Sequence, residues 1–147
     1  MISVGRIASI ISVFLALSLK GQNAKEDYDT LAKELQVREL STLMFAKYND
    51  VNINKIEAFL KKYPEGPERE KALYLRAYSI WSLHRYKEAP PAYAALLKEF
   101  PKTKFSRIAR IREAAAYLFS GQPAKALPRL EALHKDYPDR HEIYARE

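Results

Sequence analysis

The chain has 147 residues, of which 48% are hydrophobic and 29% are charged, a composition typical of one globular domain. It carries 25 basic and 18 acidic residues, and it contains no cysteine, which excludes disulfide bonds, thiolate metal sites and a lipidated cysteine. Only four residues are glycine, whereas alanine, leucine, lysine and glutamate are abundant, so the composition favours helix over strand.

Residues 1–24 are predicted to be a targeting segment. Arg6 precedes an uncharged apolar run over residues 7–19, and small residues allow cleavage after Ser18 or after Ala24. A helix of that run is about 20 Å long, short of the roughly 30 Å hydrocarbon core of a bilayer. A cleaved secretory signal is therefore favoured, with an uncleaved N-terminal anchor as the alternative. Either interpretation predicts an exported protein.

Residues 25–64 are predicted to form a degenerate helix pair that caps an array. Its first helix is expected over residues 26–48, where apolar residues gather on one face and charges on the other. The apolar face comprises Leu31, Leu35, Val37, Leu40, Leu43, Met44 and Phe45. We expect this face to pack on the next helix pair, and a coiled-coil seam is the alternative.

A repeat with a period of 37 residues follows. Its clearest mark is a recurring aromatic–proline pair, found at Tyr63-Pro64, Phe100-Pro101 and Tyr137-Pro138. Alanines keep the same spacing, because Ala77 matches Ala114 and Ala89 matches Ala126. Such a period is typical of helical arrays, in which each unit buries its apolar face against its neighbour. The sequence thus predicts repeat units over residues 65–101 and 102–138.

Each repeat unit is predicted to be two antiparallel helices. The expected helices cover residues 67–84, 87–100, 104–120 and 123–137. Gly121 supplies the turn in the second unit, because glycine adopts the left-handed conformation at little cost. Pro123 can open a helix, where a missing N–H matters little. The proline after each aromatic residue ends a helix.

Residues 139–147 are predicted to begin a further helix or to form a short cap, with Ile143 and Tyr144 as its apolar residues. So short a segment covers little of the last helix pair. The surface that it would leave open is drawn from Ala126, Leu127, Leu130 and Leu133. We therefore expect this end to dock a partner or to self-associate, with a longer repeat array as the alternative.

These residues resemble the tetratricopeptide repeat. The small first-helix residue of that family falls on Ala77 and Ala114, its turn glycine on Gly121, and its second-helix alanine on Ala89 and Ala126. The resemblance implies an all-α fold in which antiparallel helix pairs stack into a superhelix with a concave binding face. The segment endings look like the bacterial cell-envelope subgroup, which includes periplasmic and outer-membrane assembly proteins, but without the lipid-modified cysteine. Arg76 and Glu113 depart from the pattern, because the family usually has an aliphatic residue at these positions.

Two groups of residues are candidates for partner binding. Tyr74, Tyr78 and Trp81 have the spacing i, i+4, i+7 and share one helix face, which in the family lines the concave groove. Packing against Ile108, Ile111 and Ala115 of the next unit is the alternative. The second group is a basic stripe, formed by Lys104, Arg107 and Arg110. It can meet anionic groups of a partner, or it can be a solvated face.

Catalysis and cofactors have no support in the sequence. His84 is expected in a turn and His134 in a core-facing column, and together with His141 they show no metal-ligand spacing. The chain has no phosphate loop, nucleophile elbow or metal-binding helix motif. We therefore predict no enzyme activity, no cofactor and no metal. Nucleic acid is also a poor candidate, because the charge left after removal of residues 1–24 is only +5.

The sequence predicts a non-enzymatic scaffold of the cell envelope or periplasm that binds a protein or peptide on the concave face of its repeats. The alternative is an anchoring module that the basic stripe holds to anionic lipid or to an envelope polymer.

Overall fold

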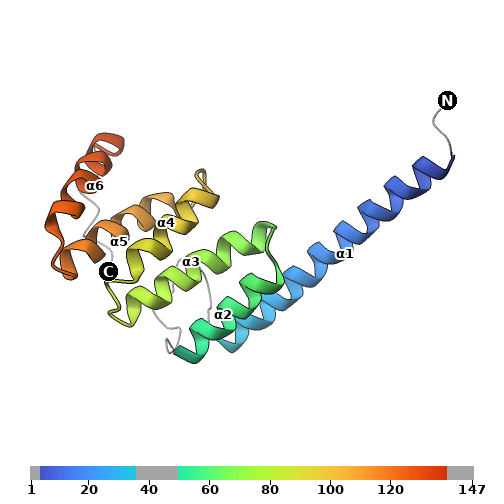
Figure 1. Cartoon of the computed structure of the whole chain (residues 1–147), viewed down its shortest axis with the longest axis horizontal. Helices are drawn as coiled ribbons and strands as arrows, with labels where there is room; N and C mark the ends of the chain where they lie inside the picture. The colour runs from blue at the N-terminus through green and yellow to red at the C-terminus, as the bar shows by residue number, and fades with distance from the viewer. Residues whose placement is uncertain (1–3, 36–49, 139–147) are drawn as a thin grey trace. The chain divides into compact units, whose positions relative to one another are not determined.

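The computed structural model describes residues 4–35 and 50–138, and every regular element in these ranges is a helix (Figure 1). The helices are α1 (Val4–Glu34), α2 (Asp50–Lys62), α3 (Pro67–Ser82), α4 (Ala89–Glu99), α5 (Ser106–Phe119) and α6 (Pro123–Asp136). The all-α class predicted from the sequence is confirmed. The four helices predicted for residues 67–137 are also confirmed, because their observed ends differ from the predicted ones by two residues or fewer.

The helix ends reproduce the 37-residue period of the sequence. α2, α4 and α6 end at Lys62, Glu99 and Asp136, each directly before an aromatic–proline pair. At the last two ends the aromatic residue leaves the helical region, since Phe100 has a ψ of 73° and Tyr137 a ψ of 63°. The following proline disfavours helical angles at the residue before it, which explains these stops.

Prolines also mark where two helices begin. α6 starts at Pro123, as predicted, and the first turn of α4 contains Pro90 and Pro91. A proline is tolerated in a first turn because the N–H that it lacks would have no helical partner. Pro128 lies inside α6.

The chain divides into two compact units, Met1–Ala72 and Leu73–Glu147. In the first unit α1 contacts α2. Both helices bury a regular apolar stripe at helical spacing, made of Ala24, Tyr28, Leu31 and Leu35 on α1 and its end, and of Ile53, Ile56, Phe59 and Tyr63 on α2 and its end. The burial of Leu31 and Leu35 agrees with the apolar face predicted for residues 26–48. The remainder of that face, Val37 to Phe45, lies outside the described residues.

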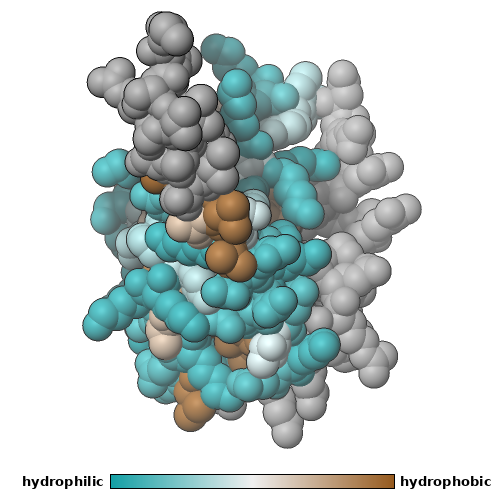
Figure 2. All heavy atoms as spheres, turned by 90° about the vertical axis from the view of Figure 1, so that its right-hand side faces the viewer, coloured by the Kyte–Doolittle hydropathy of each residue, from teal (hydrophilic) through white to brown (hydrophobic). Residues whose placement is uncertain are grey.

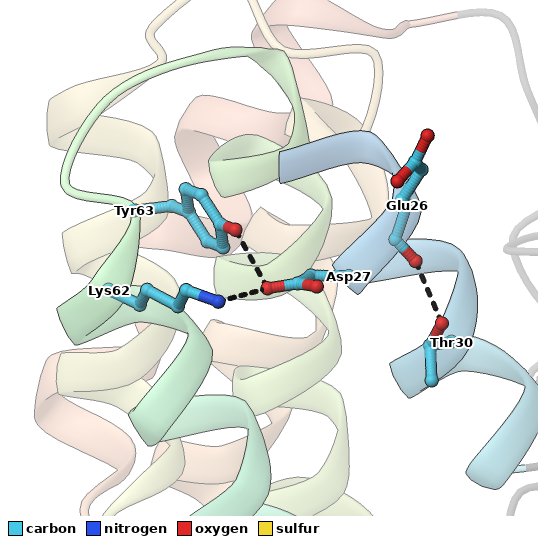
Figure 3. Close-up of polar contacts among 5 residues, drawn as sticks. All are labelled: Glu26, Asp27, Thr30, Lys62 and Tyr63. Atoms are coloured by element: carbon cyan, nitrogen blue, oxygen red, sulfur yellow. Dashed lines mark hydrogen bonds and ion pairs between the residues drawn. The ribbon is translucent and has the colours of Figure 1, made fainter. Parts of the chain in front are cut away.

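A polar contact joins the same two helices at the edge of this stripe (Figure 3). The carboxylate of Asp27 accepts hydrogen bonds from Lys62 Nζ at 2.6 Å and from the hydroxyl of Tyr63 at 2.7 Å. These two bonds stabilise the ionised carboxylate and lower the pKa of Asp27. Tyr63, the first aromatic residue of the repeat, thus links the end of α2 to α1.

The amino-terminal part of α1 differs from this packed part. Val13, Leu15, Leu17 and Leu19 are each 54–60% exposed, whereas Ala24 is buried. α1 extends past α2 on that side (Figure 1), and it is one continuous helix through both cleavage positions considered above. Among the described residues, no helix has the length and apolarity needed to span a bilayer.

In the second unit α5 contacts both α4 and α6. The alanines at the repeat positions 77, 89, 114 and 126 are completely buried, which agrees with their role as close-contact residues between helices. Tyr93 and Leu96 of α4 are buried with them.

Figure 2 shows the molecule from the right-hand side of Figure 1. The face drawn there is mainly hydrophilic, with separate apolar patches.

The surface predicted at the carboxyl-terminal end needs a correction. Ala126 and Leu133 are buried, and only Leu127 among the four residues is largely exposed, at 58%. Residues 126 and 133 are seven apart and share the buried face of α6, whereas residue 127 is turned by about 100° from it. Residues 139–147, with His141, Ile143 and Tyr144, lie outside the described residues.

Candidate functional site

A row of ring contacts joins α3 to α5 in the second unit, and we call it the aromatic ladder. Its three contacts are Tyr74–Phe105, Tyr78–Arg112 and Trp81–Phe119. On α3 the residues follow the i, i+4, i+7 spacing, and on α5 and its cap they are seven apart, so each set lies on one face. Because the contacts advance together along both helices, α3 and α5 run in the same direction, as Figure 1 also shows.

The first contact of the ladder is its closed end. The rings of Tyr74 and Phe105 are stacked, with centroids 4.2 Å apart and planes 7° apart. Both side chains belong to the core, since the residues are only 3% and 7% exposed. Burial raises the pKa of Tyr74, because the phenolate would lose its hydration there, and the nearby Arg112 partly opposes the shift.

Arg112 forms the middle of the ladder. Its Nη1 donates a hydrogen bond of 2.8 Å to the hydroxyl of Tyr74, and its guanidinium carbon lies 4.2 Å from the ring centroid of Tyr78. A guanidinium over an aromatic face is attracted by the negative charge of that face. The charge of Arg112 is thus held by two tyrosines.

The last contact is the open end of the ladder, formed by Trp81, Tyr86 and Phe119. The three ring centroids are 5.0–5.7 Å apart, and the tilted and edge-on arrangements are those that aromatic rings prefer. Phe119 is 63% exposed, and Trp81 and Tyr86 are partly exposed. His84 adds a fourth ring, set edge-on to Tyr86 at 5.5 Å.

Two equivalent turns lie beside the open end. His84 has a φ of 59° and Gly121 a φ of 74°, and the two residues are 37 positions apart. The left-handed conformation predicted for Gly121 is therefore confirmed, and the other repeat places a histidine in it. A residue with a side chain adopts this conformation at a cost of roughly 1 kcal/mol.

The structure separates the three aromatic residues that the sequence grouped together. Tyr74 and Tyr78 are buried, which favours the packing alternative, although their partners are Phe105 and Arg112 rather than Ile108, Ile111 and Ala115. Trp81 alone reaches the surface. Sequence reasoning did not place Tyr86, Arg112 or Phe119 beside the aromatic residues of α3. The seven-residue spacing of positions 105, 112 and 119 was the available signal.

The basic stripe makes contacts within its own chain. Arg110 forms an ion pair of 2.6 Å with Asp136, and the guanidinium of Arg107 lies 5.5 Å from the ring centroid of Tyr137. Lys104 is exposed, with its Nζ 5.2 Å from the ring centroid of Phe105. Two of the three cations therefore help to hold α6 and its end against α5.

Glu113, one of the two departures from the repeat pattern, is buried and paired. Its carboxylate accepts a hydrogen bond of 2.8 Å from Nε of Arg129 on α6, and Arg129 also lies over the ring of Tyr117. The second departure, Arg76, is only partly buried. Beside the Glu113–Arg129 pair is a small cleft of about 190 Å³, lined by Leu97, Arg110, Glu113, Arg129, Ala132 and Asp136.

The histidines occupy separate positions. His84 lies in a turn, as predicted, but His134 is exposed on α6, so its assignment to a core-facing column was wrong. Leu133 faces the core instead, and the adjacent residue of a helix is turned by about 100°. Within residues 4–35 and 50–138, no three His, Asp or Glu side chains are close enough to hold a metal ion.

Comparison of the chain with protein-family models, curated proteins and solved structures finds no match.

Proposed function

We propose that this protein is a non-enzymatic interaction scaffold of the cell envelope, built from tetratricopeptide-like helix pairs that stack into a superhelix. The 37-residue spacing of the helix ends supports the repeat, and so do the two left-handed turns at equivalent positions. The parallel course of α3 and α5 is the relation expected between first helices of successive units.

The observation that carries the binding role is the exposed open end of the aromatic ladder. Trp81, Tyr86 and Phe119 form a contiguous aromatic surface on a helical framework, with Phe119 63% exposed. Tryptophan and tyrosine contribute most strongly to protein interfaces, because they bury a large area with few rotatable bonds. Partner binding is accordingly centred on Trp81 rather than on Tyr74 and Tyr78.

Export rests on a different part of the chain. The amino-terminal part of α1 presents exposed apolar side chains at positions 13, 15, 17 and 19, which lie on two opposite sides of the helix, and the run over residues 7–19 contains no charged residue. A helix that is apolar all round must either be buried in an apolar environment or be cleaved from the mature protein. A targeting segment provides either outcome, by cleavage or by anchoring.

The basic stripe is a weaker basis for function. Arg107 and Arg110 are engaged with Tyr137 and Asp136, so binding of anionic lipid or polymer would compete with these contacts. Anchoring through this stripe predicts salt-sensitive binding to anionic vesicles that is lost when both arginines are changed to glutamate. The scaffold predicts that the same double variant retains its protein partner.

Crosslinking of the chain in native envelopes, followed by isolation and mass spectrometry, tests the scaffold. We expect a stoichiometric protein partner, with reduced recovery for Trp81→Ala and normal recovery for Leu127→Ala, which removes a more exposed apolar side chain from α6. Recovery of the protein only from the cytoplasm, or a partner that survives every surface substitution in the second unit, would refute the proposal.

A further inference from the structure

The charged side chains of α5 are turned toward its neighbours in the chain. Arg112 contacts Tyr74 and Tyr78 of α3. The other three charged residues contact α6 or its end, in the pairs Arg107–Tyr137, Arg110–Asp136 and Glu113–Arg129. A surface helix ordinarily has the opposite arrangement, with its charges toward water and its apolar residues toward the core.

The side chains that remain on the outer side of α5 are apolar. They are Ile108, Ile111, Ala115 and Leu118, and we call them the outward face of α5. At about 100° per residue, the four lie within an arc of about 80° of the helix. The first three are partly exposed, and Leu118 is 46% exposed. The next residue is Phe119, so the outward face continues the exposed surface at the open end of the ladder.

The equivalent positions of α3 are covered by a helix. Tyr74, Tyr78 and Trp81 contact α5 or its cap through the ladder. The residues 37 positions further along the chain are Ile111, Ala115 and Leu118. The face of α3 is covered by a helix that runs parallel to it (Figure 1) and that contacts it through residues seven apart. The outward face of α5 therefore has the positions needed to receive a further helix in the same way.

We propose that the outward face of α5 is the docking site for an amphipathic helix of a partner protein, which lies parallel to α5 as α5 lies parallel to α3. The partner helix presents apolar side chains seven residues apart, and an apolar helix face on an apolar surface is a common mode of recognition. This inference rests on the proposed scaffold function and identifies the kind of partner.

The sizes of the side chains on α5 specify the partner helix further. Each residue of the outward face is smaller than its counterpart on α3, and the difference is greatest at Ala115, where α3 has Tyr78. Protein contacts pack without large voids, so at a similar distance between helices the partner has to fill more space than α5 fills on α3. The partner helix therefore carries its largest side chain opposite Ala115.

The sequence of residues 139–147 does not meet this description. Position 142 is 37 residues after Phe105, and it is a glutamate. In register with α5, this segment would bring a carboxylate rather than an apolar side chain to Ile111, and burial of an unpaired charge is costly. The outward face is accordingly assigned to a partner.

A peptide library built on α5 itself tests the proposal. The probe is a displayed peptide with the sequence of residues 104–120, randomised at positions 105, 112 and 119, through which α5 and its cap contact α3. We select it on the full-length protein. The recovered peptides should carry an aromatic residue at position 112, because this position faces Ala115, and Leu, Ile, Met or Phe at the other two.

Substitutions on the outward face should weaken binding of the selected peptides. Measured by fluorescence anisotropy, the affinity should fall about tenfold or more in Ala115→Glu and in Leu118→Glu, because each brings a charge into an apolar contact. Leu127→Glu is the matched control, since it makes the same change at an exposed leucine of α6, and it should bind as the unaltered chain does. Circular dichroism checks that each variant is folded, and Leu118→Ala replaces any that is not.

The direction of the bound helix distinguishes this contact from nonspecific adhesion. The chain contains no cysteine, so Leu118→Cys introduces a single thiol. We expect this thiol to form a disulfide with a selected peptide that carries cysteine at position 119, and not with one that carries it at position 105. Parallel helices bring their carboxyl ends together, as Trp81 and Phe119 show for α3 and α5.

Four results with the peptides would overturn the inference. These are recovery of no peptides, recovery without apolar residues at the three positions, affinities that Ala115→Glu and Leu118→Glu leave unchanged, and a preferred disulfide at position 105. If envelope crosslinking identifies a partner that is sensitive to Trp81→Ala but not to Leu118→Glu, the scaffold stands and only this contact is wrong.

Two further results would assign the outward face to another occupant. Peptide binding that appears only when Ile143 and Tyr144 are both changed to serine would mean that residues 139–147 cover the face. A dimer in analytical ultracentrifugation that Leu118→Glu dissociates, without peptide binding, would assign the face to a second copy of this chain. Either result contradicts the proposal.

Discussion

The two ends of the aromatic ladder use the same residue types in opposite ways. At the closed end Tyr74 and Phe105 are stacked in the core, and at the open end Trp81 and Phe119 reach the surface. The difference follows from position along the helices. α3 ends at Ser82 and α5 ends at Phe119, so neither helix extends beyond the open end to cover it. Aromatic spacing on one helix thus predicts a shared face but not a shared environment.

The difference in packing between the two ends is tested most directly by removing one ring from each end. Phe105→Ala should lower the free energy of unfolding by about 3–5 kcal/mol, because it leaves a cavity against Tyr74 in a packed core. Phe119→Ala removes the same side chain from the exposed end and should cost about 1 kcal/mol or less. Urea unfolding followed by circular dichroism measures both. Equal losses would show that the two ends are equally packed.

Much of this fold could be predicted from the sequence because its signals are local. Proline disfavours helical angles at the residue before it, so the aromatic–proline pairs indicated three helix ends. Gly121 indicated its turn for a similar reason, since few other residues favour a positive φ. The period of 37 residues then placed the helices over residues 67–137.

The site was less predictable because it depends on pairing between helices. The sequence placed Tyr74 and Trp81 on one face but did not show that Phe105 covers the first while the second remains partly exposed. It also marked Glu113 as a departure without indicating Arg129, which lies 16 residues away on another helix. The partner that a long side chain contacts depends on the distances between helices, which a single sequence does not give.

Substitution of Arg112, in the middle of the ladder, should have the next largest effect on the free energy of unfolding. Arg112→Met keeps most of the side-chain volume but removes the hydrogen bond to Tyr74 and the cation over Tyr78. We expect a loss of about 1–2 kcal/mol in unfolding free energy, from one hydrogen bond and one partly desolvated cation–π contact. Arg110→Met is the control, because its exposed ion pair with Asp136 should contribute at most about 1 kcal/mol. A reversed order would mean that Arg112 is hydrated rather than held by the tyrosines.

A smaller effect compares the two turns beside the open end. His84→Gly should raise the unfolding free energy by up to about 1 kcal/mol, because glycine relieves the strained left-handed conformation while its greater freedom in the unfolded chain offsets part of the gain. Gly121→Ala imposes that strain on the equivalent turn and should destabilise by about 1 kcal/mol. Thermal melts of both variants test the pair. If His84→Gly lowers the melting temperature instead, the contact of His84 with Tyr86 outweighs the strain.

The smallest expected effect is on the unfolding free energy at alkaline pH, and it reports whether water is excluded from the closed end. Burial raises the pKa of Tyr74, so the folded protein holds this proton more firmly than the unfolded chain does. The resulting stability is complete below the unfolded tyrosine pKa of about 10 and is lost as the pH rises toward the folded value. Tyr74→Phe loses the hydrogen bond with Arg112 at every pH, but its unfolding free energy should decline less steeply above about pH 10 than that of the unaltered chain. Urea titrations across that range, with phenolate absorbance recorded in parallel, measure the slope.

Identical slopes would mean that Tyr74 ionises as readily in the folded protein as in the unfolded chain. Water would then reach the closed end, and the contrast between the two ends would be one of degree.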